Sequence, residues 1–230
     1  MSELVTYNLQ DGIATITLTN GKVNAVSPDL IASLNCALDQ AEADKAVVIV
    51  TGQPGILSAG FDLKVMGTNP QSAINLVANG FALSRRLLAH PTPVIMACTG
   101  HAMAMGAFLL LSADYRIGVE GAFNIGLNEV KIGMTMPDTG IALARDRLAT
   151  HVFQRAVCNS EIFTPQDAVS AGFLDKVVAV EQLATAAFEV ALQLQKLNMT
   201  AHKNTKRKLR KGLFADMEAG ISADRASVAA

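Results

Sequence analysis

Two short apolar runs, separated by a helix-type segment, constrain the fold most. Residues 46–51 form a continuous, mostly β-branched run, and residues 94–98 form a second apolar one. Such runs are typical of strands that are buried on both faces of a parallel sheet. A helix is predicted between them over residues 72–89, ended by His90-Pro91. Because this β-α-β order implies right-handed crossovers, the sequence predicts an α/β fold with a largely parallel sheet.

Turn and capping residues place the other elements. Asp11-Gly12 predicts a hairpin between two strands within residues 3–19. Ser27-Pro28 predicts the start of a helix, and residues 115–119 resemble another short strand. The remaining helices are predicted at 137–148, 151–158, 164–172, 180–197, 199–211 and from 213 to about 227. This pattern divides the chain into an α/β core over residues 1–160 and a helical C-terminal region over residues 161–230.

Composition excludes several classes of protein. Half of the 230 residues are hydrophobic and 17% are charged, which favours an oligomer that buries part of this apolar surface. The formal net charge of −1 argues against a general nucleic-acid binder. No apolar run reaches the roughly 18 residues of a membrane span, and no secretory signal pattern opens the sequence. We therefore expect a cytoplasmic protein without a membrane or nucleic-acid partner.

The cysteines carry no pattern of a metal or disulfide site. Cys36, Cys98 and Cys158 are widely spaced and odd in number. We interpret all three as reduced core residues, and the sequence predicts no metal site.

Two loops and one acid are the candidate chemistry. The loop from Ser58 to Leu63 follows a buried strand and contains a glycine, so it can present backbone N–H groups to a ligand oxygen. Met105-Gly106 opens a predicted helix, whose first N–H groups have no partner within the helix. Two converging donors would make an oxyanion hole suited to a thioester enolate. Glu129, flanked by Leu127, Val130 and Ile132, would be a desolvated base.

Other polar residues have a structural interpretation that we prefer. Asp62 is expected to cap the loop or the next helix, His101 to be a hydrogen-bonded structural group, and Asp138 to cap a helix. The six Lys and Arg residues between 203 and 211 are expected to form a solvated helix face, with phosphate binding as the alternative. Five methionines suit an adaptable acyl pocket or core filling equally well: Met96, Met103, Met105, Met134 and Met136.

Several motifs along nearly the whole chain resemble those of the crotonase superfamily, also called the enoyl-CoA hydratase/isomerase family. They are Asn24-Ala25, Ser58-Ala-Gly-Phe-Asp-Leu63, Thr99-Gly100 with Ala104-Met-Gly106, Ala113-Asp114-Tyr-Arg-Ile117, Gly126-Leu-Asn-Glu129, and Thr164-Pro165 with Ala171-Gly172. The resemblance implies a crotonase-like spiral of ββα units with a helical C-terminal trimerisation region. It further implies an acyl-CoA thioester substrate, no cofactor beyond the coenzyme A of that substrate, and a homotrimer or hexamer.

Site residues can be carried over by position. The resemblance implies that Phe61 and Met105 supply the two oxyanion N–H groups, although a glycine is usual at the position of Met105. Ala59, Phe61 and Leu63 match the loop that meets the adenine of coenzyme A. Lys64, and the basic helix from Lys203 to Lys211, are candidates for its phosphates.

The acid positions separate the possible reactions. Family hydratases use two glutamates, and here the first position is the apolar Phe108, which we assign to the substrate pocket, while the second is Glu129. A 1,3-proton shift needs one base only, so we predict a Δ3,Δ2-enoyl-CoA isomerase in which Glu129 carries the proton. The alternatives are a hydratase that uses His101 or Asp138, a thioesterase or decarboxylase, and a non-catalytic acyl-CoA binder.

Overall fold

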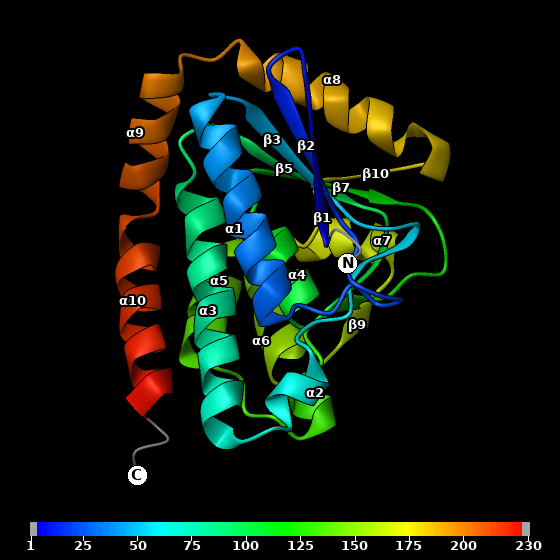
Figure 1. Cartoon of the computed structure of the whole chain (residues 1–230). Coiled ribbons are helices and arrows are strands. Elements are labelled where there is room, and N and C mark those ends of the chain that lie inside the picture. The colour runs from blue at the N-terminus through cyan, green and yellow to red at the C-terminus, as the bar shows by residue number, and fades with distance from the viewer. Residues whose placement is uncertain (1–3, 227–230) are drawn as a thin grey trace.

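The computed structural model describes residues 4–226, and two sheets organise it (Figure 1). Neighbouring strands of the main sheet are parallel, except for the β1–β2 hairpin that the Asp11-Gly12 turn predicts. In spatial order its strands are β1 (Val5–Gln10), β2 (Ile13–Leu18), β3 (Val47–Thr51), β5 (Val94–Cys98), β7 (Tyr115–Val119) and β10 (Lys176–Val178). The predicted α/β class and largely parallel sheet are confirmed.

A second, smaller sheet continues the chain beyond the main one. Its strands are β4 (Gly55–Ser58), β6 (Gly100–Met103), β8 (Ile125–Gly126) and β9 (Ile162–Phe163). The strands β4, β6 and β8 follow β3, β5 and β7 after short turns, and helices come next, which is a spiral of ββα units. Strands β4 and β6 were not predicted, because strands of four residues that contain glycine show no hydrophobic periodicity in the sequence. Gly100 is needed here, since a Cβ would overlap the backbone of Gly55.

Helices cover both faces of the main sheet. Alternate residues of β3 point in opposite directions: Val48 and Val50 pack toward α1 (Pro28–Ala43) and α3 (Pro70–Ala89), and Val47 and Ile49 toward α8 (Leu183–Gln195). The Ser27 side chain accepts from Leu30 N–H at 3.2 Å, as the predicted cap requires. Asn69 caps α3 in the same way, so α3 begins at Pro70, two residues before the predicted start. The sheet is therefore buried on both sides, which explains the continuous apolar runs.

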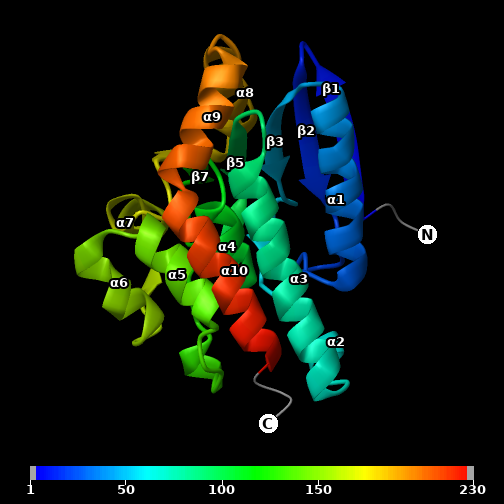
Figure 2. The same cartoon turned by 90° about the vertical axis from the view of Figure 1, so that its left-hand side faces the viewer.

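The other helices lie around the smaller sheet and at the C-terminus. They are α2 (Leu63–Met66), α4 (Met105–Leu111), η1 (Val130–Ile132), α5 (Asp138–Arg147), α6 (Thr150–Val157), α7 (Pro165–Ala171), η2 (Val180–Gln182), α9 (Met199–Leu209) and α10 (Lys211–Ala226). Figure 2 shows α10 crossing α5 and α3, and it packs against both. Since β9 and β10 belong to the two sheets, the purely helical part begins at η2, and the boundary at residue 160 stays a prediction. In residues 4–226 no helix combines the length and the apolar character of a membrane span.

Only one cysteine lies in the core. Cys98 is buried on β5, whereas Cys36 and Cys158 are exposed. The prediction of three core cysteines is therefore wrong for two of them. Cys36 lies on the outer face of α1, beside the buried Ala37 and Leu38, so one step along the helix decides its exposure.

A buried ion-pair network fastens the C-terminal helices to the core. Lys206 Nζ lies 2.6 Å and Arg210 Nη2 2.9 Å from the carboxylate of Asp114. That carboxylate also accepts from Val94 N–H at 2.8 Å, while Arg210 donates to the carbonyl of Leu88 at 2.6 Å. The basic helix is thus not simply a solvated face: Lys206 and Arg210 are 6% and 5% exposed and hold secondary structure together.

Removal of the Asp114 carboxylate is expected to destabilise the protein strongly. Asp114→Ala leaves two buried cations without their anion, a change that costs about 3–5 kcal/mol in comparable sites. Urea denaturation measures this free energy of unfolding. Glu218→Ala, which breaks the exposed Arg85–Glu218 pair, is the matched control and should cost less than about 1 kcal/mol. Equal losses in the two variants would contradict the bracing role.

Candidate active site

A cavity of about 510 Å³ brings together residues of the first predicted loop and Glu129, while from the second predicted loop Ala104 lines it and Met105 does not. Five of the predicted site residues line it: Ala59, Phe61, Leu63, Lys64 and Glu129. They come from the segment after β4, the short helix α2 and the segment after β8. More than sixty residues separate α2 from Glu129 in the sequence, and the spiral of ββα units brings the two together. The volume lies within the range of small-molecule sites, roughly 300–1,000 Å³.

Hydrogen bonds fix the first loop and leave one amide free. Ser58 Oγ donates to the Asn24 carbonyl at 2.7 Å and accepts from Gly60 N–H at 3.2 Å. Val26 N–H donates to the Gly60 carbonyl at 2.8 Å, and Asp62 N–H donates to the Val26 carbonyl at 3.1 Å. Among the described residues no acceptor meets the Phe61 N–H, which lies between these paired groups. The loop therefore holds one backbone donor at the cavity wall.

The second donor lies beside the first loop. Ala104 N–H donates to the Gly126 carbonyl at 3.0 Å, and Ala104 has a φ of 49°, which turns the chain sharply into α4. Met105 is the first residue of α4, and in the part of the chain that the structure describes its N–H has no acceptor. A Cβ built on Gly60 would lie 3.5 Å from Met105 N. The two predicted donors are therefore on adjacent backbone segments.

The side chains of the two donors anchor the segments from behind. Met105 is fully buried, and Phe61 is partly buried. A Cβ on Gly80 of α3 would overlap the Phe61 ring and lie 3.4 Å from Met105 Sδ, so both side chains pack over this glycine. Because only the N–H groups would meet a ligand oxygen, a methionine in place of the usual glycine is compatible with the site. The packing of the Met105 side chain against Gly80 therefore explains why a methionine fits at position 105, and the sequence alone does not reveal this contact.

Glu129 is the buried acid of the cavity. The residue is 7% exposed, and its Oε2 has no hydrogen-bond partner among residues 4–226. Burial raises its pKa from 4.5 to about 7. The predicted desolvation is present: of the flanking residues Ile132 lines the same cavity, whereas Val130 is 45% exposed and does not line it.

The backbone around Glu129 is held by its own turn. Ile132 N–H and Met134 N–H both donate to the Glu129 carbonyl, at 3.2 and 2.9 Å. Gly133 closes this turn with a φ of 81°, a value that favours glycine. The carboxylate therefore projects from a fixed backbone.

Phe108 lies one layer behind the cavity. Its ring meets that of Phe81 edge to face at 5.1 Å between centroids, and Phe81 lines the cavity while Phe108 does not. The assignment of Phe108 to the substrate pocket therefore needs correction: it supports the wall through Phe81. Position 108 still carries no acid, so Glu129 is the one acid at the two positions where family hydratases have glutamates.

The structural interpretations hold for Asp62 and His101 but not for Asp138. Asp62 accepts from Lys64 N–H at 2.9 Å as the N-cap of α2. His101 Nδ1 accepts from Asn124 N–H at 2.9 Å. The predicted cap at Asp138 is wrong: Pro137 is the N-cap of α5, and Asp138 is the first residue of the helix and makes no side-chain cap hydrogen bond. Neither His101 nor Asp138 lines the cavity. The basic helix does not line it either, so only Lys64 among the predicted phosphate ligands is at the site.

Several residues that line the cavity were not predicted from the sequence. Val77 and Phe81 come from α3, four residues apart on one face of the helix, and Asn128 precedes Glu129. The apolar spacing of residues 77 and 81 was readable, yet it predicts burial rather than a ligand site. Met66, Met134 and Pro137 also line the cavity. Met134 is one of the five methionines, whereas Met96 and Met105 fill the core.

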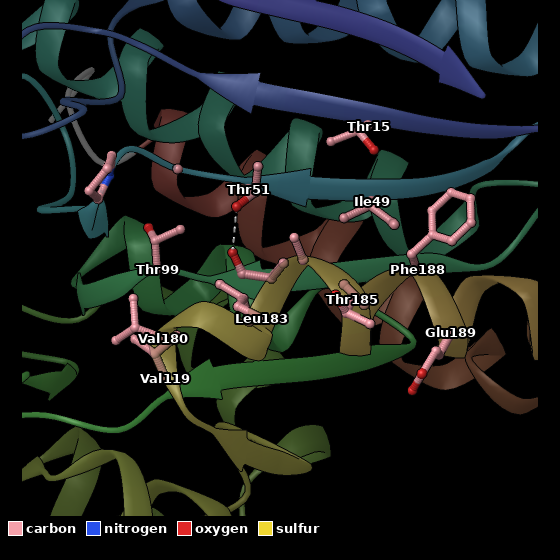
Figure 3. Close-up of a pocket in the computed structure, with 15 residues that line it drawn as sticks. Thr15, Ile49, Thr51, Thr99, Val119, Val180, Leu183, Thr185, Phe188 and Glu189 are labelled. Atoms are coloured by element: carbon pink, nitrogen blue, oxygen red, sulfur yellow. Dashed lines mark hydrogen bonds between the residues drawn. The ribbon is translucent and has the colours of Figure 1, made fainter.

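A larger cavity of about 600 Å³ lies elsewhere, between α8 and the main sheet (Figure 3). Its walls are mostly apolar, with Ile49, Val180 and Phe188 among them, and its Thr51 hydroxyl donates to the Ala97 carbonyl at 2.9 Å. The one ionisable residue in its described lining is the exposed Glu189. Since it holds no buried acid or base, we place the chemistry in the smaller cavity.

Burial of Glu129 is expected to make stability depend on pH. The folded-state pKa of about 7 lies above the ordinary 4.5, so wild-type protein loses stability as pH rises between these values. Glu129→Gln removes this loss, and its stability relative to wild type should grow by about 1–3 kcal/mol between pH 4.5 and pH 8. Urea denaturation at the two pH values measures it. The exposed Glu189→Gln should show no such growth, and a pH-independent difference for Glu129→Gln would count against a buried, neutral acid.

Comparison with known proteins places the chain in a family. The family model described as "Enoyl-CoA hydratase/isomerase" matches residues 8–229. A crystal structure of an enoyl-CoA hydratase/isomerase family protein from Pseudomonas syringae superposes with a TM-score of 0.96 at 65% identity, covering 97% of both chains. The mouse protein "Enoyl-CoA delta isomerase 1, mitochondrial" is 30% identical over 87% of this chain and 71% of its own length.

Another relative carries the name of a different reaction. "Carnitinyl-CoA dehydratase" of Salmonella enteritidis is 28% identical over 84% of this chain and 75% of its own length. Two backbone donors and a buried acid on a ββα spiral, together with a match over nearly the whole sequence, lead to one conclusion: this chain belongs to the enoyl-CoA hydratase/isomerase family.

Proposed function

We propose that the protein is a Δ3,Δ2-enoyl-CoA isomerase. The observation that carries the proposal is the single buried carboxylate of the cavity: among its described lining residues, Glu129 is buried and its Oε2 has no hydrogen-bond partner, whereas Asp62 is engaged as a helix cap. A pKa near 7 suits a group that must both accept and return a proton at neutral pH.

The reaction needs one proton carrier. The Glu129 carboxylate takes a proton from C2 of a 3-enoyl-CoA, and the C2–H electron pair forms a dienolate whose charge lies on the thioester oxygen. The N–H groups of Phe61 and Met105 would stabilise this oxygen. Protonated Glu129 then delivers the same proton to C4, the double bond moves to C2–C3, and the carboxylate is regenerated. No atom is gained or lost.

Hydration is less well supported. It requires a group that holds and activates water in addition to the acid, and position 108 is an apolar side chain one layer behind the wall. The predicted substitutes, His101 and Asp138, do not line the cavity. We further propose that Ala59, Leu63 and Lys64 meet the coenzyme A part of the substrate, with the exposed Lys64 near its phosphates. The cytoplasmic location stays a prediction.

Loss of the acid is the direct test of function. With 3-hexenoyl-CoA, ultraviolet absorbance of the conjugated product should show turnover by wild type, with kcat/KM rising through a midpoint near pH 7 as Glu129 ionises. Glu129→Gln should lower kcat/KM by about 10²–10⁴, and the control Glu189→Gln should not. Mass spectrometry identifies the product, since hydration adds the mass of water. Full activity of Glu129→Gln, or a hydrated product, would refute the proposal.

We also propose that the chain forms a homotrimer or a hexamer. In a single chain Val180 of η2, at the cavity under α8, is 55% exposed. Leu192 of α8 is 37% exposed. Coverage of this face by another copy would account for the high apolar content. Light scattering after size-exclusion chromatography should give three or six chain masses, and a stable monomer at micromolar concentration would exclude such an assembly.

A further inference from the structure

A second cavity adjoins the proposed catalytic one. Its volume is about 460 Å³, and it is bounded by α3, by the segment from Met134 to Asp138 and by the last turns of α10. Four residues line both cavities: Met66, Val77, Met134 and Pro137. A residue that faces two cavities forms a wall between them, so we call these four residues the shared wall and the second space the distal cavity.

The shared wall is built on the two segments that hold the proposed catalytic groups. Met66 ends α2, directly after the Phe61 loop, and its N–H donates to the Asp62 carbonyl at 3.0 Å. Met134 N–H donates to the Glu129 carbonyl at 2.9 Å. Both methionines are therefore placed by the same backbone that places Phe61 and Glu129. Their unbranched, flexible side chains can yield to a ligand that passes between the cavities.

The distal cavity has an apolar side and an acidic side, and no cation stands in its described lining. Ala73, Ile74, Met136 and Ala223 join the shared wall on the apolar side, and Thr135, Asp138 and Asp224 are the other lining residues. Its acids repel anions: the Asp224 carboxylate accepts from Asp138 N–H at 3.3 Å and from the Thr139 hydroxyl at 3.1 Å. The anionic coenzyme A moiety is thus excluded from this side, and the uncharged end of an acyl chain fits it.

We propose that the distal cavity receives the far end of the acyl chain and that the protein favours acyl-CoA thioesters of medium or long chain. This inference rests on the proposed function for its substrate class. Methylenes beyond the catalytic cavity would leave water for the distal cavity, and each one buried strengthens binding by about fourfold. The shared wall then determines how readily chains of different length pass.

Binding of saturated thioesters tests the inference without turnover. Calorimetry on the full chain should show that dodecanoyl-CoA binds at least about tenfold more tightly than hexanoyl-CoA. Ala73→Trp fills the distal cavity from α3 and should reduce this ratio of affinities by about tenfold, and Ala73→Phe should act in the same direction. The ratio of kcat/KM for 3-dodecenoyl-CoA over 3-hexenoyl-CoA should fall in parallel.

The matched control is Asn75→Trp. Asn75 lies on the same helix, is exposed and lines neither cavity, so the affinity ratio should stay at its wild-type value. Hexanoyl-CoA binding reports whether each variant is folded. An unchanged ratio in folded Ala73→Trp or Ala73→Phe, or equal wild-type affinities for the two thioesters, would overturn the inference. Wild type that binds by chain length but isomerises neither enoyl substrate would refute only the proposed function.

Discussion

The N-terminus of α4 lies against the backbone of β4, and the proposed site depends on this contact. A Cβ on Gly106 would overlap the Ser58 carbonyl, and a Cβ on Gly60 would lie 2.9 Å from that of Ala104. Two glycines therefore let two segments, separated by more than forty residues, approach more closely than side chains allow. Because of this approach, the N–H groups of Phe61 and Met105 lie on adjacent backbone segments, and Glu129, from the third ββα unit, lines the cavity that Phe61 also lines.

Glu129 and Asp114 are both buried carboxylates, but their pKa values shift in opposite directions. At Glu129 burial outweighs the one opposing contribution, a hydrogen bond from its own backbone, so the pKa rises to about 7 and the acid becomes suited to proton transfer. Asp114 is also buried, which by itself raises its pKa, but the charges of Lys206 and Arg210 outweigh this effect and hold the pKa below its ordinary value. The first carboxylate is reactive and the second is a brace that fixes α9, and with it α10, whose last turns border the distal cavity.

Local signals predicted the main elements because each has a local physical cause. Buried strands need apolar runs on both faces, and Ser27, Thr164 and Gly172 act at helix ends as expected from their side chains or backbone freedom. The strands β4 and β6 were not predicted, because they form through pairing with segments distant in sequence and not through their own composition. The exposure of Cys36 and Cys158, and the burial of Lys206, were missed for a related reason: they depend on which face of a helix meets the core.

The sequence by itself determined the α/β class, the two donor segments, the one retained acid and, through its motifs, the family, since each is written in residue types at fixed spacing. Only the tertiary structure decided that Phe108 stands behind Phe81, that Glu129 is enclosed by residues distant in sequence, and that Met66 and Met134 separate two cavities. The physical reason is that burial and cavity shape arise from packing between elements, which residue order along one element does not specify.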